Sequence, residues 1–314
     1  MFESILVPLD GSSFGEQALP MALKVAGRSN AKLEVVHVHE TLSPLYSQPL
    51  AGIEGGFEKE IRSHRAAYLD GVVKRLKAQS KVPVTPVFLE GSVIQAILDH
   101  VSTKKSTLIV MTTHGHGPLA RFWLGSVADE LIRHGPTPIL LVHPQEENQS
   151  KVPTIRKILV SLDGSTFSEA MLQNAVEFAR MMEAELWLIR VIQPMILGNL
   201  TVPEPAVGSV TPSAIAQLES WHEQRKKEAA GYLQKLGESL RSPSLKVRTS
   251  VVSHEQPAVA ILNEARTQGA DLIAIETHGR GGLSRFFLGS VADKVIRGAN
   301  IPVLVHRSIQ KDEG

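Results

Sequence analysis

Two glycine-rich stretches of the chain carry residue types that can hold a phosphate group. The first reads THGHGPLARFWLGSVAD (residues 113–129), and the second reads THGRGGLSRFFLGSVAD (residues 277–293). Backbone N–H groups at the start of a helix bind anions well, because they lack a partner within the helix and the helix dipole is positive there. Glycine lets the backbone approach such an anion closely. The repeated stretch therefore predicts a bound phosphate in each half.

The expected phosphate contacts come from one loop and one helix start in each copy. Loop glycines precede a Gly-Ser-Val step, at which we expect the next helix to begin. The expected contact residues are Gly115, Gly117, Gly125, Ser126 and Val127 in the first copy, and Gly279, Gly281, Gly289, Ser290 and Val291 in the second. His114 and His278 occupy the same place in the two loops, and we expect them to orient the loop or to line the pocket.

The serines of these helix starts also have a purely structural interpretation. Ser126 with Asp129 has the spacing of a helix cap in which an acidic side chain reciprocates, and so has Ser290 with Asp293. A helix needs such a cap with or without a ligand. We expect both serines to cap their helices and to contact phosphate in addition.

The elements that must position these loops alternate between strands and helices. Short apolar runs predict strands, and stretches with helical spacing predict helices between them. The expected strands of the first half are 5–9, 33–38, 84–89, 108–112 and 139–142, and the expected helices are one after Ser13, with Glu16 at capping-box spacing, then 57–79, 93–101 and 125–134. The second half repeats this order, with an insertion around residues 194–212.

Alternating strands and helices require crossover connections, and hence a parallel sheet covered on both faces. We predict an α/β fold with two doubly wound parallel five-stranded sheets in tandem, each in the strand order 3-2-1-4-5. Strands one and four are then neighbours at the point where the winding reverses, and ligands bind beyond their carboxyl ends. Asp10 and Asp163 close the first strands. Each could form an Asx turn or face the adenosine end of a nucleotide, and both interpretations stay open.

The repeat divides the chain into two expected domains, residues 1–145 and 154–310, joined by a polar stretch flanked by prolines. The fifth strands, at 138–142 and 302–305, are apolar although this strand order places them at a sheet edge. An uncovered apolar edge invites aggregation. We therefore expect the two edges to pair with each other as an intramolecular pseudo-dimer, or with another chain in a homodimer.

Composition narrows the class of protein. The chain has 314 residues, of which 43% are hydrophobic and 21% charged, and a net charge of +1. This balance is typical of a soluble globular protein and gives no field that would recruit nucleic acid or a membrane. Cysteine is absent, which excludes disulfides and thiol chemistry. The start of the chain lacks the pattern of a signal peptide, so we expect a cytoplasmic protein.

The Asp-Gly-Ser turn after strand one, the Thr-His-Gly loop and the Gly-Ser-Val helix start resemble the universal stress protein family in its tandem form. The resemblance covers almost the whole chain, twice. It implies a flavodoxin-like (Rossmann-like) fold. The nucleotide-binding branch of that family has Gly, two residues, Gly, nine residues, and Gly followed by Ser or Thr. The resemblance therefore implies a stress-response regulator that binds ATP or another adenine nucleotide, with or without Mg²⁺.

The same resemblance assigns contacts residue by residue. It implies adenosine contacts by Pro8, Asp10 and Val38 in the first half and by Asp163 and Val191 in the second, with phosphates at Ser126–Val127 and Ser290–Val291. The first glycine of the pattern is Thr112 in the first half, where we also expect a ligand contact, and Glu276 in the second. Glu276 would weaken phosphate binding unless its side chain turns away. The first half is thus closer to the nucleotide-binding pattern.

Other functions stay open beside nucleotide-dependent regulation. The chain could be a scaffold of the same fold that has lost nucleotide affinity, or an enzyme acting on a nucleotide. No Walker motif is present, so ATP hydrolysis or autophosphorylation would be slow, and we assign no catalytic residue. His37 and His39 share one face of a strand, as metal ligands can, but no third ligand is evident. We expect both to be structural histidines and expect no metal bound by protein side chains.

Overall fold

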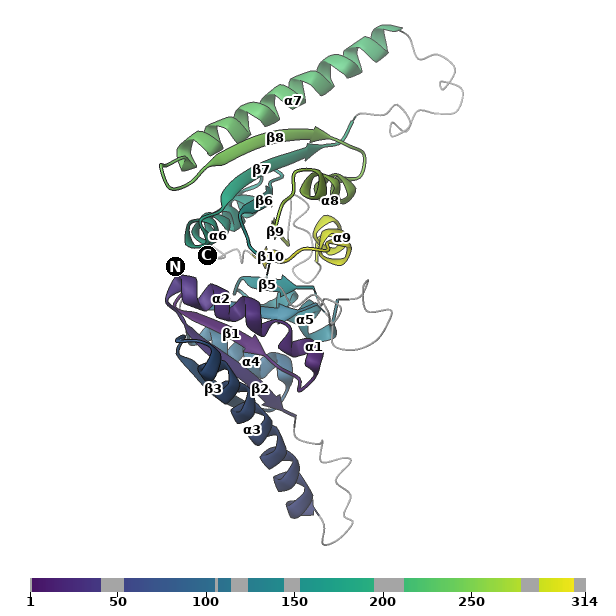
Figure 1. The fold of residues 1–314 in the computed structure, drawn as a ribbon. Coiled ribbons are helices and arrows are strands. Elements are labelled where there is room, and N and C mark those ends of the chain that lie inside the picture. The colour runs from purple at the N-terminus through teal and green to yellow at the C-terminus, as the bar shows by residue number, and fades with distance from the viewer. Residues whose placement is uncertain are drawn as a thin grey trace, which may run out of the picture.

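The computed structural model describes residues 2–40, 54–104, 107–113, 124–143, 153–194, 212–277 and 288–307. Strands and helices alternate along both halves (Figure 1). The first half contains β1 (Ser4–Pro8), α1 (Ser13–Glu16), α2 (Leu19–Ser29), β2 (Lys32–His39), α3 (Glu54–Gln79), β3 (Val84–Glu90), α4 (Val93–Ser102), β4 (Thr107–Thr112), α5 (Ser126–His134) and β5 (Ile139–Val142). The second half contains β6 (Lys157–Ser161), α6 (Thr166–Met182), β7 (Glu185–Ile192), α7 (Pro212–Leu240), β8 (Val247–Ser253), α8 (Pro257–Thr267), β9 (Leu272–Glu276), α9 (Ser290–Gly298) and β10 (Val303–His306).

The strand order confirms the predicted fold class. In the first half the order is β3-β2-β1-β4-β5 with every neighbour parallel, and the second half repeats it as β8-β7-β6-β9-β10. The two apolar edge strands, β5 and β10, pair with each other in antiparallel register, which joins the halves into one ten-stranded sheet. Leu140 lies opposite Leu304, its counterpart in the repeat, so an approximate two-fold axis passes between them.

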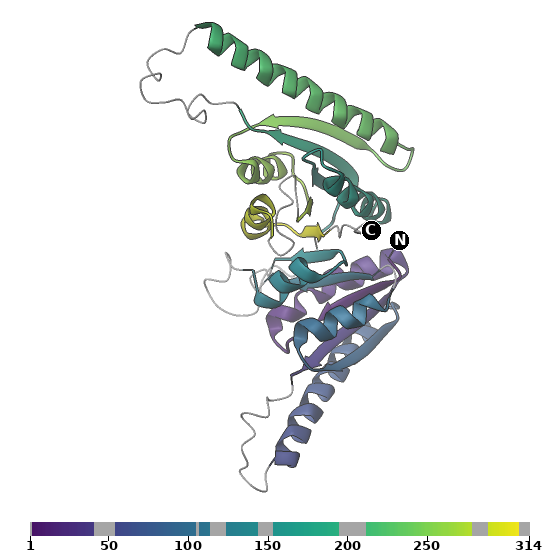
Figure 2. The same cartoon turned by 180° about the vertical axis from the view of Figure 1, so that it is seen from behind.

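Helices cover both faces of this sheet, because side chains along each strand point alternately to opposite sides. Ile5 and Val7 face a layer formed by α2, α3, α6 and α7, whereas Leu6 faces a layer formed by α4, α5, α8 and α9. Figures 1 and 2 show α3 and α7 as the outermost helices, at opposite ends of the molecule. With both faces covered, the central strands are buried except at some of their ends, as their nearly continuous apolar sequences require.

The helix expected after the first strand is broken in one half only. In the first half it forms the short α1 and then α2, which has Pro20 in its first turn. Proline has no N–H for a helical hydrogen bond. The second half has Gln173 at this position, and α6 is continuous. The predicted cap is also wrong by one residue: Ser12 caps α1, while Glu16 accepts a hydrogen bond from Tyr68.

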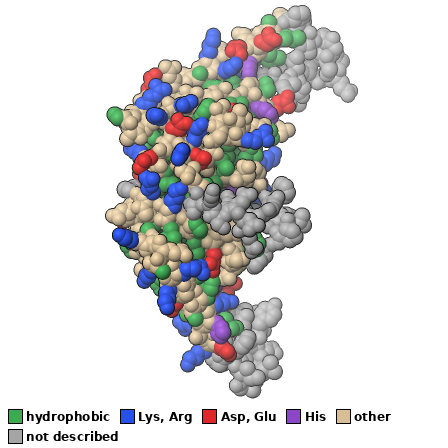
Figure 3. Space-filling model, in the orientation of Figure 1, with side chains coloured by type: hydrophobic (Ala, Val, Ile, Leu, Met, Phe, Trp, Pro, Cys, Tyr) green, Lys and Arg blue, Asp and Glu red, His purple; other side chains and the backbone are tan. Residues whose placement is uncertain are grey.

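Basic and acidic side chains are interspersed on the face of the molecule shown in Figure 3, in keeping with the net charge of +1. None of the described helices combines the length and the apolar character needed to cross a membrane.

Candidate functional site

The carboxyl ends of β1 and β4 lie side by side in the sheet. The two strands are parallel, with Ser4 opposite Thr107 and Leu6 opposite Ile109. The turn that begins at Asp10 and the segment that begins at Thr113 therefore leave the same edge of the sheet from adjacent strands. This is the place where open α/β sheets bind ligands.

Asp10 has a fixed position in the turn after β1. Its Oδ1 accepts a hydrogen bond from the Ser12 amide at 2.9 Å, which makes the predicted Asx turn, and Gly11 supplies the required left-handed conformation with φ +91°. Ser12 in turn accepts a bond from the Gly15 amide at 3.0 Å. Asp10 is exposed, and its second carboxylate oxygen has no hydrogen-bond partner among the described residues. One oxygen thus holds the turn, and the side chain is exposed to solvent.

The motif glycines before α5 and α9 are explained by contact with the protein's own backbone. The Gly125 amide donates to the Thr113 carbonyl at 2.7 Å, and the Gly289 amide donates to the Thr277 carbonyl at 2.8 Å. A Cβ at Gly125 would lie 3.3 Å from that carbonyl oxygen, and one at Gly289 would lie 2.7 Å from its counterpart. These two amides are already bonded. The expected phosphate donors are therefore limited to the amides of the residues that follow Gly125 and Gly289.

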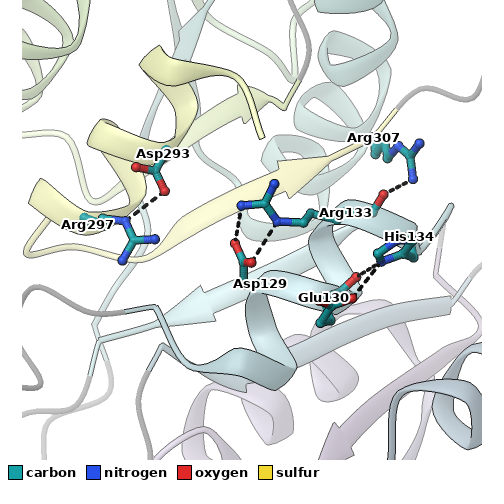
Figure 4. Close-up of polar contacts among 7 residues, drawn as sticks. All are labelled: Asp129, Glu130, Arg133, His134, Asp293, Arg297 and Arg307. Atoms are coloured by element: carbon teal, nitrogen blue, oxygen red, sulfur yellow. Dashed lines mark hydrogen bonds and ion pairs between the residues drawn. The ribbon is translucent and has the colours of Figure 1, made fainter. Parts of the chain in front are cut away.

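Neither serine caps its helix, so this prediction is wrong. Gly125 and Gly289 occupy the N-cap positions instead. The amide of each glycine bonds to the carbonyl of Thr113 or Thr277, so each helix begins at the serine itself, without a side-chain cap. The acidic residues point elsewhere: Asp129 Oδ2 lies 2.7 Å from Arg133 Nε (Figure 4). Asp293 Oδ1 lies 2.8 Å from Arg297 Nε in the same way.

The first amides of α5 remain available to an anion. The first helical bond runs from the Asp129 amide to the Gly125 carbonyl at 2.9 Å. In the part of the chain that the structure describes, no acceptor reaches the amides of Ser126, Val127 and Ala128. Ser126 is exposed as well. The start of α9 has the same arrangement, with its first bond from the Asp293 amide to the Gly289 carbonyl.

The apolar residues predicted for the site lie on one face of the sheet. Val38 is 9% exposed and belongs to the layer that also contains Leu124 and, at its edge, Val127. Val191 and Val291 contact the same layer in the second half. Pro8 ends β1 and is half-buried. The structure thus places Val38 and the start of α5 on the same face of the sheet.

Thr112 and Glu276 face the other side of the sheet. Their neighbours two residues earlier, Val110 and Ala274, belong to the layer beneath α2 and α6, so alternation places these two side chains away from α5 and α9. Glu276 is buried, and its Oε2 lies 3.2 Å from Nδ1 of His306. This orientation points the Thr112 side chain away from the start of α5, and the ligand contact expected at Thr112 stays a prediction. The same orientation also turns the Glu276 carboxylate away from the start of α9.

The loops before α5 and α9 contain six further residues that the sequence predicts for the site. These six lie outside the described residues: His114, Gly115, Gly117, His278, Gly279 and Gly281. Their contacts with a ligand therefore stay predictions.

Sequence reasoning missed a polar group beside the Asp10 turn. The Tyr68 hydroxyl donates to Glu16 at 2.9 Å, and Tyr232 donates to Glu169 at 2.9 Å in the second half. Burial, followed by the hydrogen bond to the glutamate, raises the pKa of both tyrosines. The recurrence of a tyrosine at the same place in the two long charged helices was the signal that could have found this pair.

The two strand histidines have structural partners, as expected. Nδ1 of His37 lies 2.8 Å from the carbonyl oxygen of Leu9, so Nδ1 carries the proton and donates. Burial, the largest effect, lowers the pKa of His37, which keeps the ring neutral at neutral pH. Nδ1 of His39 lies 3.1 Å from Nη1 of Arg65. Both rings also contact Phe88.

Comparison with known proteins gives one consistent result. A family model described as the universal stress protein family matches residues 1–143 and again residues 154–307. A universal stress protein of Mycolicibacterium smegmatis (strain ATCC 700084 / mc(2)155) is 27% identical over 311 residues, covering 96% of each chain. One from Mycobacterium tuberculosis (strain ATCC 25618 / H37Rv) is 26% identical over 305 residues, again covering 96% of each. A crystal structure of a universal stress protein from Archaeoglobus fulgidus DSM 4304 shares the fold, with a TM-score of 0.66 at 19% identity, over 99% of this chain and 97% of that one.

Proposed function

The chain belongs to the universal stress protein family, and from this premise we propose that it binds ATP or a related adenine nucleotide and acts as a regulator in the stress response. One observation carries the proposal. The exposed Asp10 carboxylate and the unpartnered amides at the start of α5 occupy the same edge of the sheet, beyond the neighbouring strands β1 and β4.

The two groups suit the two ends of a nucleotide. The free oxygen of Asp10 can accept a hydrogen bond from a sugar hydroxyl or a base N–H. The amides of Ser126 and Val127 can donate to phosphate oxygens, and the helix dipole there favours an anion by about 0.3–1 kcal/mol, or up to about 2 kcal/mol when partly buried. Val38, on the neighbouring strand β2, would contribute an apolar contact for the adenine ring. Mg²⁺ would be held chiefly by the phosphates.

A regulatory role follows from what this site would do on binding. A nucleotide that contacts both β1 and α5 stabilises their folded arrangement, by about 2.7 kcal/mol at a concentration of 100 times Kd. Ligand-dependent stability of this kind can control the binding of a partner. We propose residues 1–145 and 154–310 as the two domains and the β5–β10 pairing as an intramolecular equivalent of a dimer contact. A scaffold without nucleotide affinity is the alternative, supported by the same strand pairing.

The test combines analysis of bound ligand with thermal melting. Mass analysis of small molecules released from the purified chain should find an adenine nucleotide, and added ATP should raise Tm by about 5 °C at 100 times Kd. Asp10→Asn should abolish most of this rise, because it removes the charge of the carboxylate. The exposed Asp70→Asn is the matched control and should keep it. A ligand-free protein whose Tm ignores ATP would favour the scaffold.

A further inference from the structure

The turns after β1 and β6 have the same sequence, Asp-Gly-Ser, but different surroundings. A Cβ at Gly11 would meet nothing within 4 Å. A Cβ at Gly164 would lie 2.9 Å from Cζ of Arg190 and 3.0 Å from each of its two terminal nitrogens. The guanidinium therefore lies flat against the turn of the second half. Asp10 and Gly11 are exposed, whereas Asp163 and Gly164 are half-buried.

Arg190 is held in this place by the helix that covers it. Its Cζ lies 5.3 Å from the centroid of the Tyr232 ring, a distance typical of a cation–π contact. Tyr232 is fixed by its hydrogen bond to Glu169. The tyrosine–glutamate pair exists in the first half too, as Tyr68 with Glu16. The residue that differs between the halves is the one on the strand beneath the tyrosine.

That position is His37 in the first half and Arg190 in the second, since each follows two apolar strand residues in the repeat. The His37 ring is bonded back to the Leu9 carbonyl and is neutral, because burial lowers its pKa. An arginine is charged at every accessible pH and offers five donors in a rigid plane. The strand position beside the turn thus carries a permanent cation in the second half and a neutral imidazole in the first.

The two carboxylates differ accordingly. Oδ1 of Asp10 accepts one bond, from the Ser12 amide. Oδ1 of Asp163 accepts two, from the amide of Ser165 at 2.9 Å and from its hydroxyl at 2.6 Å. The equivalent carboxylate in the second half is therefore more fully bonded by the protein and lies beside a guanidinium. Arg190 lies under Tyr232 of α7, so its guanidinium covers the side of the Asp163 turn that faces α7, whereas a Cβ at Gly11 in the first half would meet nothing within 4 Å.

We propose that Arg190 blocks the adenosine side of the site in the second half. The chain then binds one adenine nucleotide, in its first half, and the second half binds none. The inference rests on the proposed function and determines which half performs it. Arg190 acts by occupying the binding surface, and its replacement by the residue of the first half should open a second site.

The test is isothermal titration calorimetry of the full chain with ATP. The wild type should bind one ATP per chain, and Asp10→Asn should lose it. Arg190→His, which installs the residue of the first half, should raise the stoichiometry to two. Arg190→His combined with Asp10→Asn should bind one, in the second half. Arg190→Gln is a second variant that removes the cation while keeping a polar chain, and circular dichroism melting checks that each variant is folded.

The outcomes separate this inference from the proposed function. Two ATP per wild-type chain, or a stoichiometry of one that persists in both folded Arg190 variants, contradicts the blocking role of Arg190 but not the proposed nucleotide binding. Binding of one ATP by Asp10→Asn with unchanged affinity places the ligand in the second half and also contradicts the blocking role of Arg190. A chain that binds no ATP in any of these forms overturns the proposed function itself.

Discussion

At the scale of single residues, the same strand position can hold different chemistry in the two halves. Glu34 on β2 is 3% exposed, whereas its counterpart on β7 is Trp187. Oε2 of Glu34 lies 2.9 Å from Nε2 of His100 and accepts a bond from Lys104, and Oε1 lies 3.0 Å from Nζ of Lys32. Burial alone would raise the pKa of Glu34, but these hydrogen bonds outweigh it and lower the pKa from 4.5 to about 2.

This pKa predicts how stability depends on acid. A carboxyl whose pKa is lowered by folding stabilises the protein above its unfolded pKa, and the stabilisation is lost as the pH falls from about 4.5 toward 2. Glu34→Gln should therefore lower the free energy of unfolding by about 3 kcal/mol at pH 7. Urea unfolding at neutral pH and at about pH 3 measures this difference, which should shrink in acid.

The control for this prediction is Glu219→Gln, because Glu219 is exposed on α7 and should contribute less than about 0.5 kcal/mol. Equal losses in the two variants at neutral pH, or a Glu34→Gln loss that grows in acid, would contradict the assignment.

How far the site residues could be predicted depended on whether their contacts are local. The Asp10 turn follows from three adjacent residues, and the sequence predicted it. The prediction of serine caps was wrong because the Gly125 amide bonds to a carbonyl twelve residues earlier, which makes the helix begin at Ser126 itself. Arg190 was missed because its contact with Gly164 joins strand β7 to the turn after β6. No local sequence pattern indicates that these two residues are in contact.

At the scale of elements, periodicity predicted the strands and most helices because buried strands and amphipathic helices leave a direct imprint on sequence. The break between α1 and α2 was missed although Pro20 stood in the sequence, because proline is also tolerated in a first helical turn. The close backbone approach at Gly125 and Gly289 could not be predicted, since it depends on where two ends of a loop meet.

The two motif glycines should respond differently to alanine. Both have φ near −60°, which any residue can adopt, so only contact with the threonine carbonyl opposes a side chain. Gly289→Ala places Cβ at 2.7 Å from that oxygen and should destabilise the protein by about 1–3 kcal/mol. Gly125→Ala, at 3.3 Å, should change stability by less than about 1 kcal/mol, because reduced freedom of the unfolded chain offsets a mild clash.

Chemical denaturation of the two variants provides the comparison, and each serves as the other's control. Equal and small effects would show that the loop ends relax freely, against the close approach seen at Gly289.

At the scale of the whole molecule, the halves are joined by more than one strand pair. The ring nitrogen Nε2 of His143, just after β5, lies 3.2 Å from the Ile296 carbonyl of α9. Arg307, its counterpart after β10, donates to the Arg133 carbonyl of α5 (Figure 4). Arg28 on α2 also lies 2.6 Å from Glu183, at the end of α6. These contacts predict that the halves unfold together.

Leu304 tests this coupling, because it is fully buried on β10 at the approximate two-fold axis. Leu304→Asp places an unpaired charge at the junction and should cost about 3–5 kcal/mol. Differential scanning calorimetry should then show the single transition of the wild type split into two. Val259→Asp, on the exposed side of α8, should leave one transition. A single wild-type-like transition in Leu304→Asp would contradict the prediction that this strand pair couples the halves.

The most direct measurement is a crystal structure of the chain with a non-hydrolysable ATP analogue. The account predicts density for the analogue in the first half, with phosphate oxygens within hydrogen-bond distance of the Ser126 and Val127 amides and the adenosine beside Asp10. Phosphate density away from the start of α5, or an empty crevice at saturating analogue, would contradict it.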